Sequence, residues 1–406
     1  MLALLAWRNL WRRPQRTLLS LASIVLVVAL LVFMLSFQRG VYATMTENNL
    51  RVFDGYAQLQ APGYAEDPVI ERVIDDPRSI VRGALAIQGV SAAATRVNAF
   101  ALLANGERSY GALVAGVDPQ SEARLSTIAA TVREGRYLNA ADTNAAVLGE
   151  MLARNLKLRV GGTVSLLGPA HDGSIAADVL EVVGIFRSGI PQLDRSILEM
   201  PLARAQDTFA MADRANTIAL GGPTLAAVDA ALPRLDALGA GHGIAVLGWQ
   251  QLEPAMRDAI ALKYAMSLLL YLTLVAVVAF IILNALLMSV LERTHEFGVL
   301  LAIGMRSRAI GLMVWLELLS LAVCGCLLGF AIGAGATLLL ERHGISFATL
   351  AQLLAEYGLP PRLYPRLDAV SALTGPLAIL AAIVVGGVVP YVRVARLTAI
   401  MDLRSA

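Results

Sequence analysis

Residues 18–37 read LLSLASIVLVVALLVFMLSF, a run without a single charged side chain. A helix needs about 18 or more consecutive apolar residues to cross the hydrocarbon core of a bilayer. Three later runs are also long enough: Tyr264–Leu291, Ile310–Leu340 and Ala369–Val392. Hydrophobic residues make up 57% of the chain and charged residues 16%, whereas about a quarter of a soluble domain is charged. The sequence therefore predicts an integral membrane protein with four transmembrane α-helices.

Arginines set the expected orientation of these spans. Four of them precede the first span: Arg8, Arg12, Arg13 and Arg16. The positive-inside rule then places the N-terminus in the cytoplasm, and four spans return the C-terminus to the same side. A cleavable signal peptide is the alternative for the first span, but the apolar run is too long for a signal core and no A-x-A site follows at Ser36–Gly40.

This topology places a large extracytoplasmic α+β domain between the first and second spans. The expected segments are a cytoplasmic interfacial helix (1–17), the first span (18–45), the external domain (46–255), the second span with its extracytoplasmic extension (256–291), a cytoplasmic segment (292–309), the third span (310–340), an extracytoplasmic loop (341–368), the fourth span (369–392) and a cytoplasmic tail (393–406). Within the interfacial helix, Trp7 and Trp11 share one face beside Arg8 and Arg12, as suits headgroup depth.

Strand and helix patterns alternate through the external domain, which favours two lobes. The runs Ala93–Ala104 and Arg108–Val117 predict a hairpin with Asn105-Gly106 as its turn. Further strands are expected at Thr163–Leu167, Asp178–Phe186 and Ser196–Met200, and helices at Ser79–Gln88, Gly149–Leu158, Leu202–Met211 and Leu225–Leu238. From about Gln250 a helical pattern runs into the second span, and such a stiff rod could carry movement from the membrane to the domain.

The segment most specific for function reads ERTHEFGVLLAIG at residues 292–304. A charged cluster precedes a short amphipathic turn, and Gly304 can end that turn. An ordinary hairpin loop would explain the arginines that follow, but not the apolar run Phe297–Ile303, which would be exposed without a partner. A short helix whose apolar face fits a groove on another protein explains both features.

This segment resembles the E-R-x-R-E-[IF]-G-[VIL]-x-[RK]-A-[IL]-G signature of the FtsX-like permeases, which include macrolide-exporter and lipoprotein-releasing ABC transporter subunits of type VII. Two positions depart from the signature: His295 stands in place of Arg, and Leu301 in place of Arg or Lys. In the family this is the coupling helix that docks on the nucleotide-binding subunit. The resemblance therefore implies these ATPase-coupling residues: Glu292, Arg293, Glu296, Phe297, Gly298, Leu300, Ala302, Ile303 and Gly304.

Three further stretches carry the same resemblance in the order that the family shows. Residues 6–17 (AWRNLWRRPQRT) are similar to its A-W-R-N-L-x-R-x-x-x-R-T opening, and residues 390–397 (PYVRVARL) to its P-A-x-R-A-A-R-L ending. In the external domain, residues 148–153 (LGEMLA) and 157–164 (KLRVGGTV) resemble its G-E-x-L-A and L-x-V-G-D-x-V pair.

Small residues at four-residue spacing predict close helix packing in lipid. They form two ladders: Gly325, Gly329 and Gly333 in the third span, and Ala378, Ala382 and Gly386 in the fourth. Glu317 in the third span and Asn284 in the second are costly in a bilayer, and either a packing or a transport role is open for both. Cys324 and Cys326 point to nearly opposite faces of a helix, so neither a disulfide nor a metal site is expected from them.

No motif for enzyme chemistry is present. A Walker A loop needs Gly-Lys-[Ser/Thr], but leucine precedes both Lys157 and Lys263. The four histidines show no ligand spacing, so no metal site is predicted, and a net charge of +2 gives no reason to expect nucleic acid. We expect a non-catalytic subunit without a cofactor of its own, with ATP and Mg²⁺ bound by a partner ATPase.

The resemblance implies a half-transporter of the bacterial inner membrane. Its expected partners are an ABC ATPase, a second permease copy or paralogue, membrane lipid, and a periplasmic carrier or adaptor. Its implied substrates are lipoproteins, lipids, or hydrophobic peptides and antibiotics taken from the outer leaflet or periplasm. Two alternatives stay open: a mechanotransmitting regulator of cell-wall hydrolases, and a membrane-anchored sensor without an ATPase.

Overall fold

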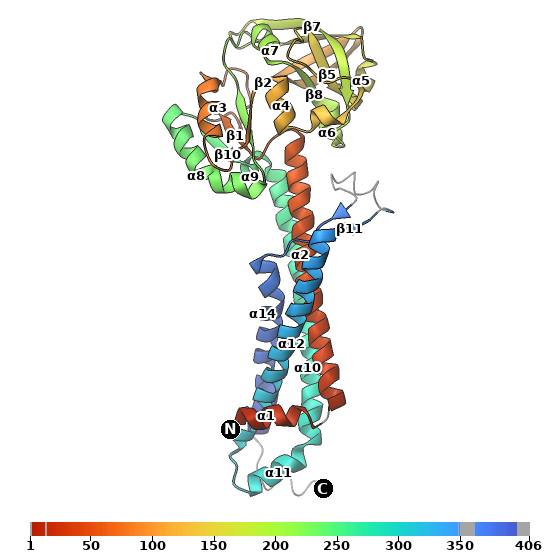
Figure 1. The fold of residues 1–406 in the computed structure, drawn as a ribbon, viewed down its shortest axis with the longest axis vertical. Coiled ribbons are helices and arrows are strands. Elements are labelled where there is room, and N and C mark those ends of the chain that lie inside the picture. Colours follow the sequence, from red (N-terminus) through yellow and green to blue (C-terminus); the bar gives the residue numbers. More distant parts are fainter. Residues whose placement is uncertain (1, 13, 348, 350–361, 396–406) are drawn as a thin grey trace. The chain divides into compact units, whose positions relative to one another are not determined.

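The computed structural model describes residues 2–12, 14–347, 349 and 362–395 (Figure 1). The predicted tail at 396–406 and most of the loop at 348–361 lie outside these residues. The chain divides into two compact units, which are described separately below. The membrane unit comprises residues 1–43, 260–348 and 362–406, and the external unit comprises residues 44–259 with 349–361.

Helices make up nearly all of the described membrane unit. They are α1 (Leu2–Leu10), α2 (Pro14–Val52), α10 (Pro254–Glu292), α11 (Thr294–Ala302), α12 (Ser307–His343), α14 (Ala369–Gly386) and α15 (Val388–Ala395). Four helical stretches are long and apolar enough to cross a membrane: Thr17–Val52, Pro254–Glu292, Ser307–His343 and Ala369–Ala395. The prediction of four spans is confirmed. Pro14 begins α2, as suits a residue whose nitrogen has no hydrogen to donate.

Side chains from α2, α10, α12 and α14 form the core of the membrane unit. The glycine ladder of α12 faces α2: a Cβ on Gly329 would lie 2.7 Å from Cβ of Val28, and one on Gly333 would lie 2.8 Å from the Ala29 carbonyl oxygen. Gly325 meets Ile24 in the same way. Glycine thus lets the two backbones approach closely, which lipid by itself does not drive. In the other ladder, Gly386 faces α10, and Ala378 and Ala382 pack partly against the same core.

Polar side chains also join the helices of the membrane unit. The Gln38 amide on α2 donates to Ser267 (2.6 Å) and accepts from the Tyr271 hydroxyl (2.9 Å), both on α10. Arg39 pairs with Asp368, and that carboxylate also accepts the Ser371 backbone N–H (2.8 Å) at the start of α14. Buried polar groups need such partners, so these contacts fix how the helices pair.

The external unit is built on one ten-stranded sheet. Its strands are β1 (Ala57–Gln60), β2 (Ala92–Asn105), β3 (Arg108–Val117), β4 (Val132–Gly135), β5 (Ala145–Gly149), β6 (Thr163–Pro169), β7 (Ile175–Phe186), β8 (Ile197–Pro201), β9 (Thr217–Gly221) and β10 (Ala245–Gly248). The order is β10-β1-β9-β2-β3-β8-β5-β7-β4, and β6 pairs with β2 and β7. Helices in this unit are α3 (Pro77–Leu85), α4 (Pro119–Leu125), α5 (Glu150–Leu156), α6 (Pro191–Ser196), α7 (Leu202–Thr208), α8 (Leu225–His242) and α9 (Trp249–Leu252).

Four hydrophobic clusters lie in the external unit, and the regions around the two largest are called the first and second lobes below. The first lobe centres on β1, β9, α3 and α8, and the second on β3, β5–β8, α5 and α7. Strand β2 belongs to both, because it pairs with β9 over Ala92–Arg96 and with β3 over Arg96–Asn105. The α+β class is confirmed, and so is the hairpin, with Gly106 at φ +59° in its turn. The expectation of two lobes stays a prediction, because one continuous sheet joins both regions.

Several short strands were not predicted from the sequence. Strands β1, β5 and β9 are buried along their whole length, so they lack the alternation of apolar and polar residues that marks a half-exposed strand. Among the helices, α8 continues past Pro233 to His242 instead of ending at Leu238, and the short helices α4 and α6, and α9 as a separate helix, were not predicted.

A buried polar cluster lies in the external unit. Arg96 donates to Glu122 through Nε (3.0 Å) and Nη2 (2.7 Å), and the Tyr137 hydroxyl donates to Oε2 of Glu199 (2.7 Å). Burial, and next the Glu122 carboxylate, raise the pKa of Glu199 to about 8, although Tyr137 and Arg96 act to lower it. Glu199 is therefore protonated at neutral pH.

Glu199 should make the folded protein sensitive to pH. Its pKa rises from 4.5 to about 8 on folding. Between these pH values, Glu199 is mostly protonated in the folded state and mostly ionised in the unfolded state. Stability should therefore fall as pH rises through this interval. We expect Glu199→Gln, which stays neutral, to reduce the loss of melting temperature across the interval, measured by thermal unfolding of the solubilised protein. An unchanged pH dependence in Glu199→Gln would contradict this.

Candidate functional site

The segment between the second and third spans folds as the short helix α11. Its end is closed by backbone hydrogen bonds from Gly304 N–H to the Leu301 carbonyl (3.0 Å) and from Met305 N–H to the Leu300 carbonyl (3.0 Å). This pattern is a Schellman motif, which needs a left-handed residue, and Gly304 provides it with φ +98°. The glycine thus stops the helix and turns the chain toward α12.

One face of α11 is packed against its own chain. Phe297 is fully buried, in a cluster with residues of neighbouring helices: Ala6, Val290, Ile310, Met313, Val314 and Val394. Gly298 is buried beside it. The sequence predicts that the apolar run Phe297–Ile303 needs a groove, and for Phe297 and Gly298 the chain itself provides one. Docking of the run on a partner stays a prediction.

The opposite face of α11 is open. Val299 is 45% exposed and Ile303 is 78% exposed, one helical turn apart. His295, Glu296 and Ala302 are exposed as well. This face combines an apolar pair with charged and polar neighbours, as expected of a surface that binds another protein.

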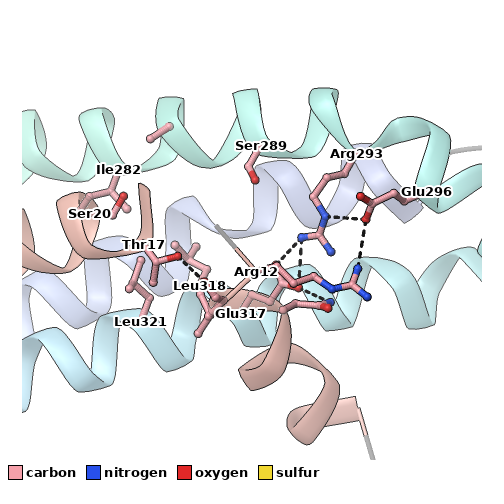
Figure 2. A pocket seen from close by; sticks show the side chains of 13 residues that line it. Arg12, Thr17, Ser20, Ile282, Ser289, Arg293, Glu296, Glu317, Leu318 and Leu321 are labelled. Atoms are coloured by element: carbon pink, nitrogen blue, oxygen red, sulfur yellow. Dashed lines mark hydrogen bonds and ion pairs between the residues drawn. The ribbon is translucent and has the colours of Figure 1, made fainter. Parts of the chain in front are cut away.

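A buried carboxylate ties α11 to the other helices. Glu317 on α12 is 6% exposed and accepts hydrogen bonds from Asn9 Nδ2 (2.8 Å) and Arg293 Nη1 (3.0 Å). Arg293 also donates from Nε to Glu296 (3.3 Å), and Arg12 lies 3.9 Å from the same carboxylate. Figure 2 shows Arg293 reaching both Glu317 and Glu296, with Arg12 beside Glu296. The cluster links α1, α11 and α12 at the point where α10 ends.

A cavity of about 100 Å³ adjoins this cluster. Its polar end carries Arg12, Arg293 and Glu317, and its apolar end carries Ile282 and Leu321 (Figure 2). The cavity leaves space beside the ion pair within the packed helices. Among the residues that the structure describes, no cluster of His, Cys, Asp or Glu could hold a metal ion.

Comparisons with known proteins identify the family. The model described as "FtsX-like permease C-terminal" matches residues 268–399, and the one described as "MacB-like periplasmic core domain" matches residues 17–238, more than half of the 406-residue chain. The chain belongs to the FtsX-like permeases with a MacB-like periplasmic core. It is thus a permease of the type VII ABC transporter family and a multi-pass protein of the bacterial inner membrane.

Individual relatives are more distant. The lipoprotein-releasing system transmembrane protein LolC of Neisseria meningitidis serogroup B is 24% identical over 337 residues, 78% of each chain. The macrolide export ATP-binding/permease protein MacB of Bdellovibrio bacteriovorus is 48% identical over 61 residues, 15% of this chain and 9% of that protein. The crystal structure of the periplasmic region of MacB from Actinobacillus actinomycetemcomitans is 14% identical, with a TM-score of 0.37, and the match covers 52% of this chain and 96% of that one.

Only some of the predicted ATPase-coupling residues lie at the Glu317 cluster. Arg293, Glu296 and Phe297 lie at or near the Glu317 cluster, and Arg293 also stacks 5.3 Å from the Phe297 ring centre. The other predicted coupling residues lie around it: Glu292, Ala302 and Gly304 are exposed, and Leu300 is half-buried. Asn9 was missed, although it is a polar residue inside an otherwise apolar and basic helix.

The contacts of Glu317 favour a packing role over a transport role. A carboxylate at this depth is tolerated when it is paired and hydrogen-bonded, and Asn9 and Arg293 meet both conditions. Asn284, by contrast, is exposed on α10. Of the two cysteines, Cys326 is buried and Cys324 half-buried, and both are free.

Breaking one side of the Glu317–Arg293 pair should destabilise the permease. Arg293→Met leaves the buried carboxylate without its cation, at a cost on the order of 3 kcal/mol. We expect its melting temperature in detergent to fall by more than that of the double variant Arg293→Met/Glu317→Leu, in which no charge is left unpaired. Equal losses in the single and double variants would show that the two groups are not coupled.

Proposed function

We propose that the chain is the non-catalytic permease subunit of a complex in which a separate ATPase drives movements of the external unit. These movements would extract or export lipoproteins, lipids or other hydrophobic compounds from the inner membrane or the periplasm. The observation that carries the proposal is α11: one face is anchored in the chain, and the other presents Val299 and Ile303 without a partner in the described residues.

An anchored helix with an open apolar face suits the transfer of force. Phe297 and the Arg293–Glu317 pair hold α11 against α10 and α12, so a partner that seats Val299 and Ile303 would move these helices with it. Short amphipathic helices commonly bind by placing their apolar side chains in a groove of the partner. In this proposal the groove belongs to the ATPase, which also binds ATP and Mg²⁺.

The proposed orientation places α11 and both termini in the cytoplasm. Arg8 and Arg12 on one side of the first span, and Arg306 and Arg308 beside α11, support it by the positive-inside rule. A complete transporter would also need a second permease, identical or paralogous, because this chain contributes only one coupling helix. A periplasmic carrier or adaptor is a further partner in this proposal.

Lipoproteins or lipids are the first choice of substrate class. The similarity to LolC, a protein of a lipoprotein-releasing system, extends over 78% of both chains, whereas the MacB match spans 9% of that macrolide exporter. Breadth of similarity thus favours release of a lipid-anchored cargo. Hydrophobic peptides and antibiotics are the second choice.

Charges on the open face of α11 should release the ATPase. We expect Val299→Asp/Ile303→Asp to lower the affinity of the ATPase for the permease on the order of 100-fold or more, because central apolar contacts contribute about 2 kcal/mol each. The measurement is affinity purification of the tagged permease in mild detergent, followed by quantification of the bound ATPase.

The matched control is Ile175→Asp/Val179→Asp, which places the same charges on exposed apolar positions of the external unit. This control should retain the ATPase. Full retention of the ATPase by the α11 variant would count against docking at this face, and absence of any ATPase from the wild-type complex would refute the proposed function.

A further inference from the structure

The C-terminal end of α2 is hydrogen-bonded into the external unit. The last carbonyl groups of a helix have no partner within it and need donors from elsewhere. The Arg51 carbonyl accepts the backbone N–H of Thr127 (2.9 Å), and the Phe53 carbonyl accepts Nη2 of Arg96 (2.6 Å). Both donors come from residues distant in the sequence, so tertiary contacts cap this helix.

Arg96 is the strongest of these attachments. Its side chain is completely buried, its guanidinium carbon lies 4.2 Å from the centre of the Phe53 ring, and two of its nitrogens bind Glu122 on α4. A cation at the C-terminal end of a helix also interacts favourably with the helix dipole. One side chain therefore joins the end of α2 to α4 and to strand β2.

The position of Arg96 on β2 lies between the two lobes. Its backbone pairs with Thr217 on β9, in the first lobe, and with Val117 on β3, in the second lobe. Nearby, Ala93 contributes to the first hydrophobic core and Val97 to the second. A displacement of Arg96 would thus act on the strand that both lobes share.

The start of α10 is attached differently. This helix begins at Pro254, and one contact between α2 and its first turn is a long amide–sulfur contact of 3.9 Å, from Asn49 to Met256. Such a contact is weaker than the charge-assisted hydrogen bonds of Arg96. The expectation that the second span carries movement to the domain stays a prediction beside this joint at the end of the first span.

We propose that Arg96, held by Glu122, is the positioning residue through which movement of α2 reaches both lobes of the external unit. The proposal rests on the proposed function, since it needs an ATPase to move the helices. It adds a defined joint to that function: a rigid, charge-assisted attachment at the one strand that both lobes share.

The test needs variants that remove the joint without leaving a buried charge. Removal of Arg96 alone would leave the buried Glu122 carboxylate without a cation. Replacement of a whole buried ion pair by apolar side chains is often tolerated. We therefore choose Arg96→Met/Glu122→Leu. The matched control is Arg204→Met/Asp178→Leu, which removes an equally close two-point pair (2.8 and 2.6 Å) between α7 and β7 within the second lobe.

Hydrogen–deuterium exchange of the full complex provides the readout. The permease with its copurified ATPase is compared without nucleotide and after trapping with ATP and vanadate. In the wild type and the control, trapping should change deuterium uptake both in α11 (294–302) and in the β2–β3 hairpin (92–117). In Arg96→Met/Glu122→Leu, the change in α11 should remain and the change in the hairpin should be lost.

Each other outcome is informative. The joint is refuted if the hairpin still responds in Arg96→Met/Glu122→Leu, if the control loses the response equally, or if the wild-type hairpin never responds while α11 does. Absence of an ATPase, or of any response in α11 of the wild type, refutes the proposed function instead. Should the double variant fail to fold, Arg96→Lys serves in its place. A lysine ammonium lacks the planar fork with which Arg96 binds Glu122 and the Phe53 carbonyl, so this variant should weaken the hairpin response.

Discussion

The ion pair between Arg293 and Glu317 is the interaction on which the α11 end of this permease depends. A carboxylate at this depth would be too costly alone, so α12 must lie where Arg293 and Asn9 can reach it. That requirement fixes the end of α10, the start of α11 and the helix α1 together. Apolar packing around Phe297 then completes the anchor, and the open face of α11 follows from it.

A related arrangement occurs in the external unit. There the buried pair of Arg96 and Glu122 fixes the end of α2 against the sheet, as Arg293 and Glu317 fix the end of α10 in the membrane unit. In both places an arginine makes several hydrogen bonds at once, which a lysine could not match. Apolar contacts between helices permit sliding, whereas such polar joints define one position. In the proposed function, the helices would transmit displacement where these joints hold them.

The sequence predicted the features that depend on a local rule. It did not predict contacts between residues that are distant in the chain. The end of α11 was foreseen because Gly304 suits a left-handed turn, and the β2–β3 hairpin because Asn105-Gly106 suits its tight turn. The covering of Phe297 by helices of its own chain was not predicted, because a short helix of mixed character does not reveal which neighbour covers it. Strands β1, β5 and β9 were missed because burial on both faces removes the alternating pattern.

The sequence by itself determined the four spans, the α+β domain between the first two, and the glycine that ends the short helix before the third. Each depends on a signal contained in one stretch of chain: apolar length, strand periodicity, or a motif with a glycine at its end. Only the tertiary structure decided which side of α11 is open, that Glu317 meets Asn9 and Arg293, and that Arg96 joins α2 to both lobes. These contacts link residues tens to hundreds of positions apart, and the energy of burying a charge, which selects them, depends on neighbours that no local pattern contains.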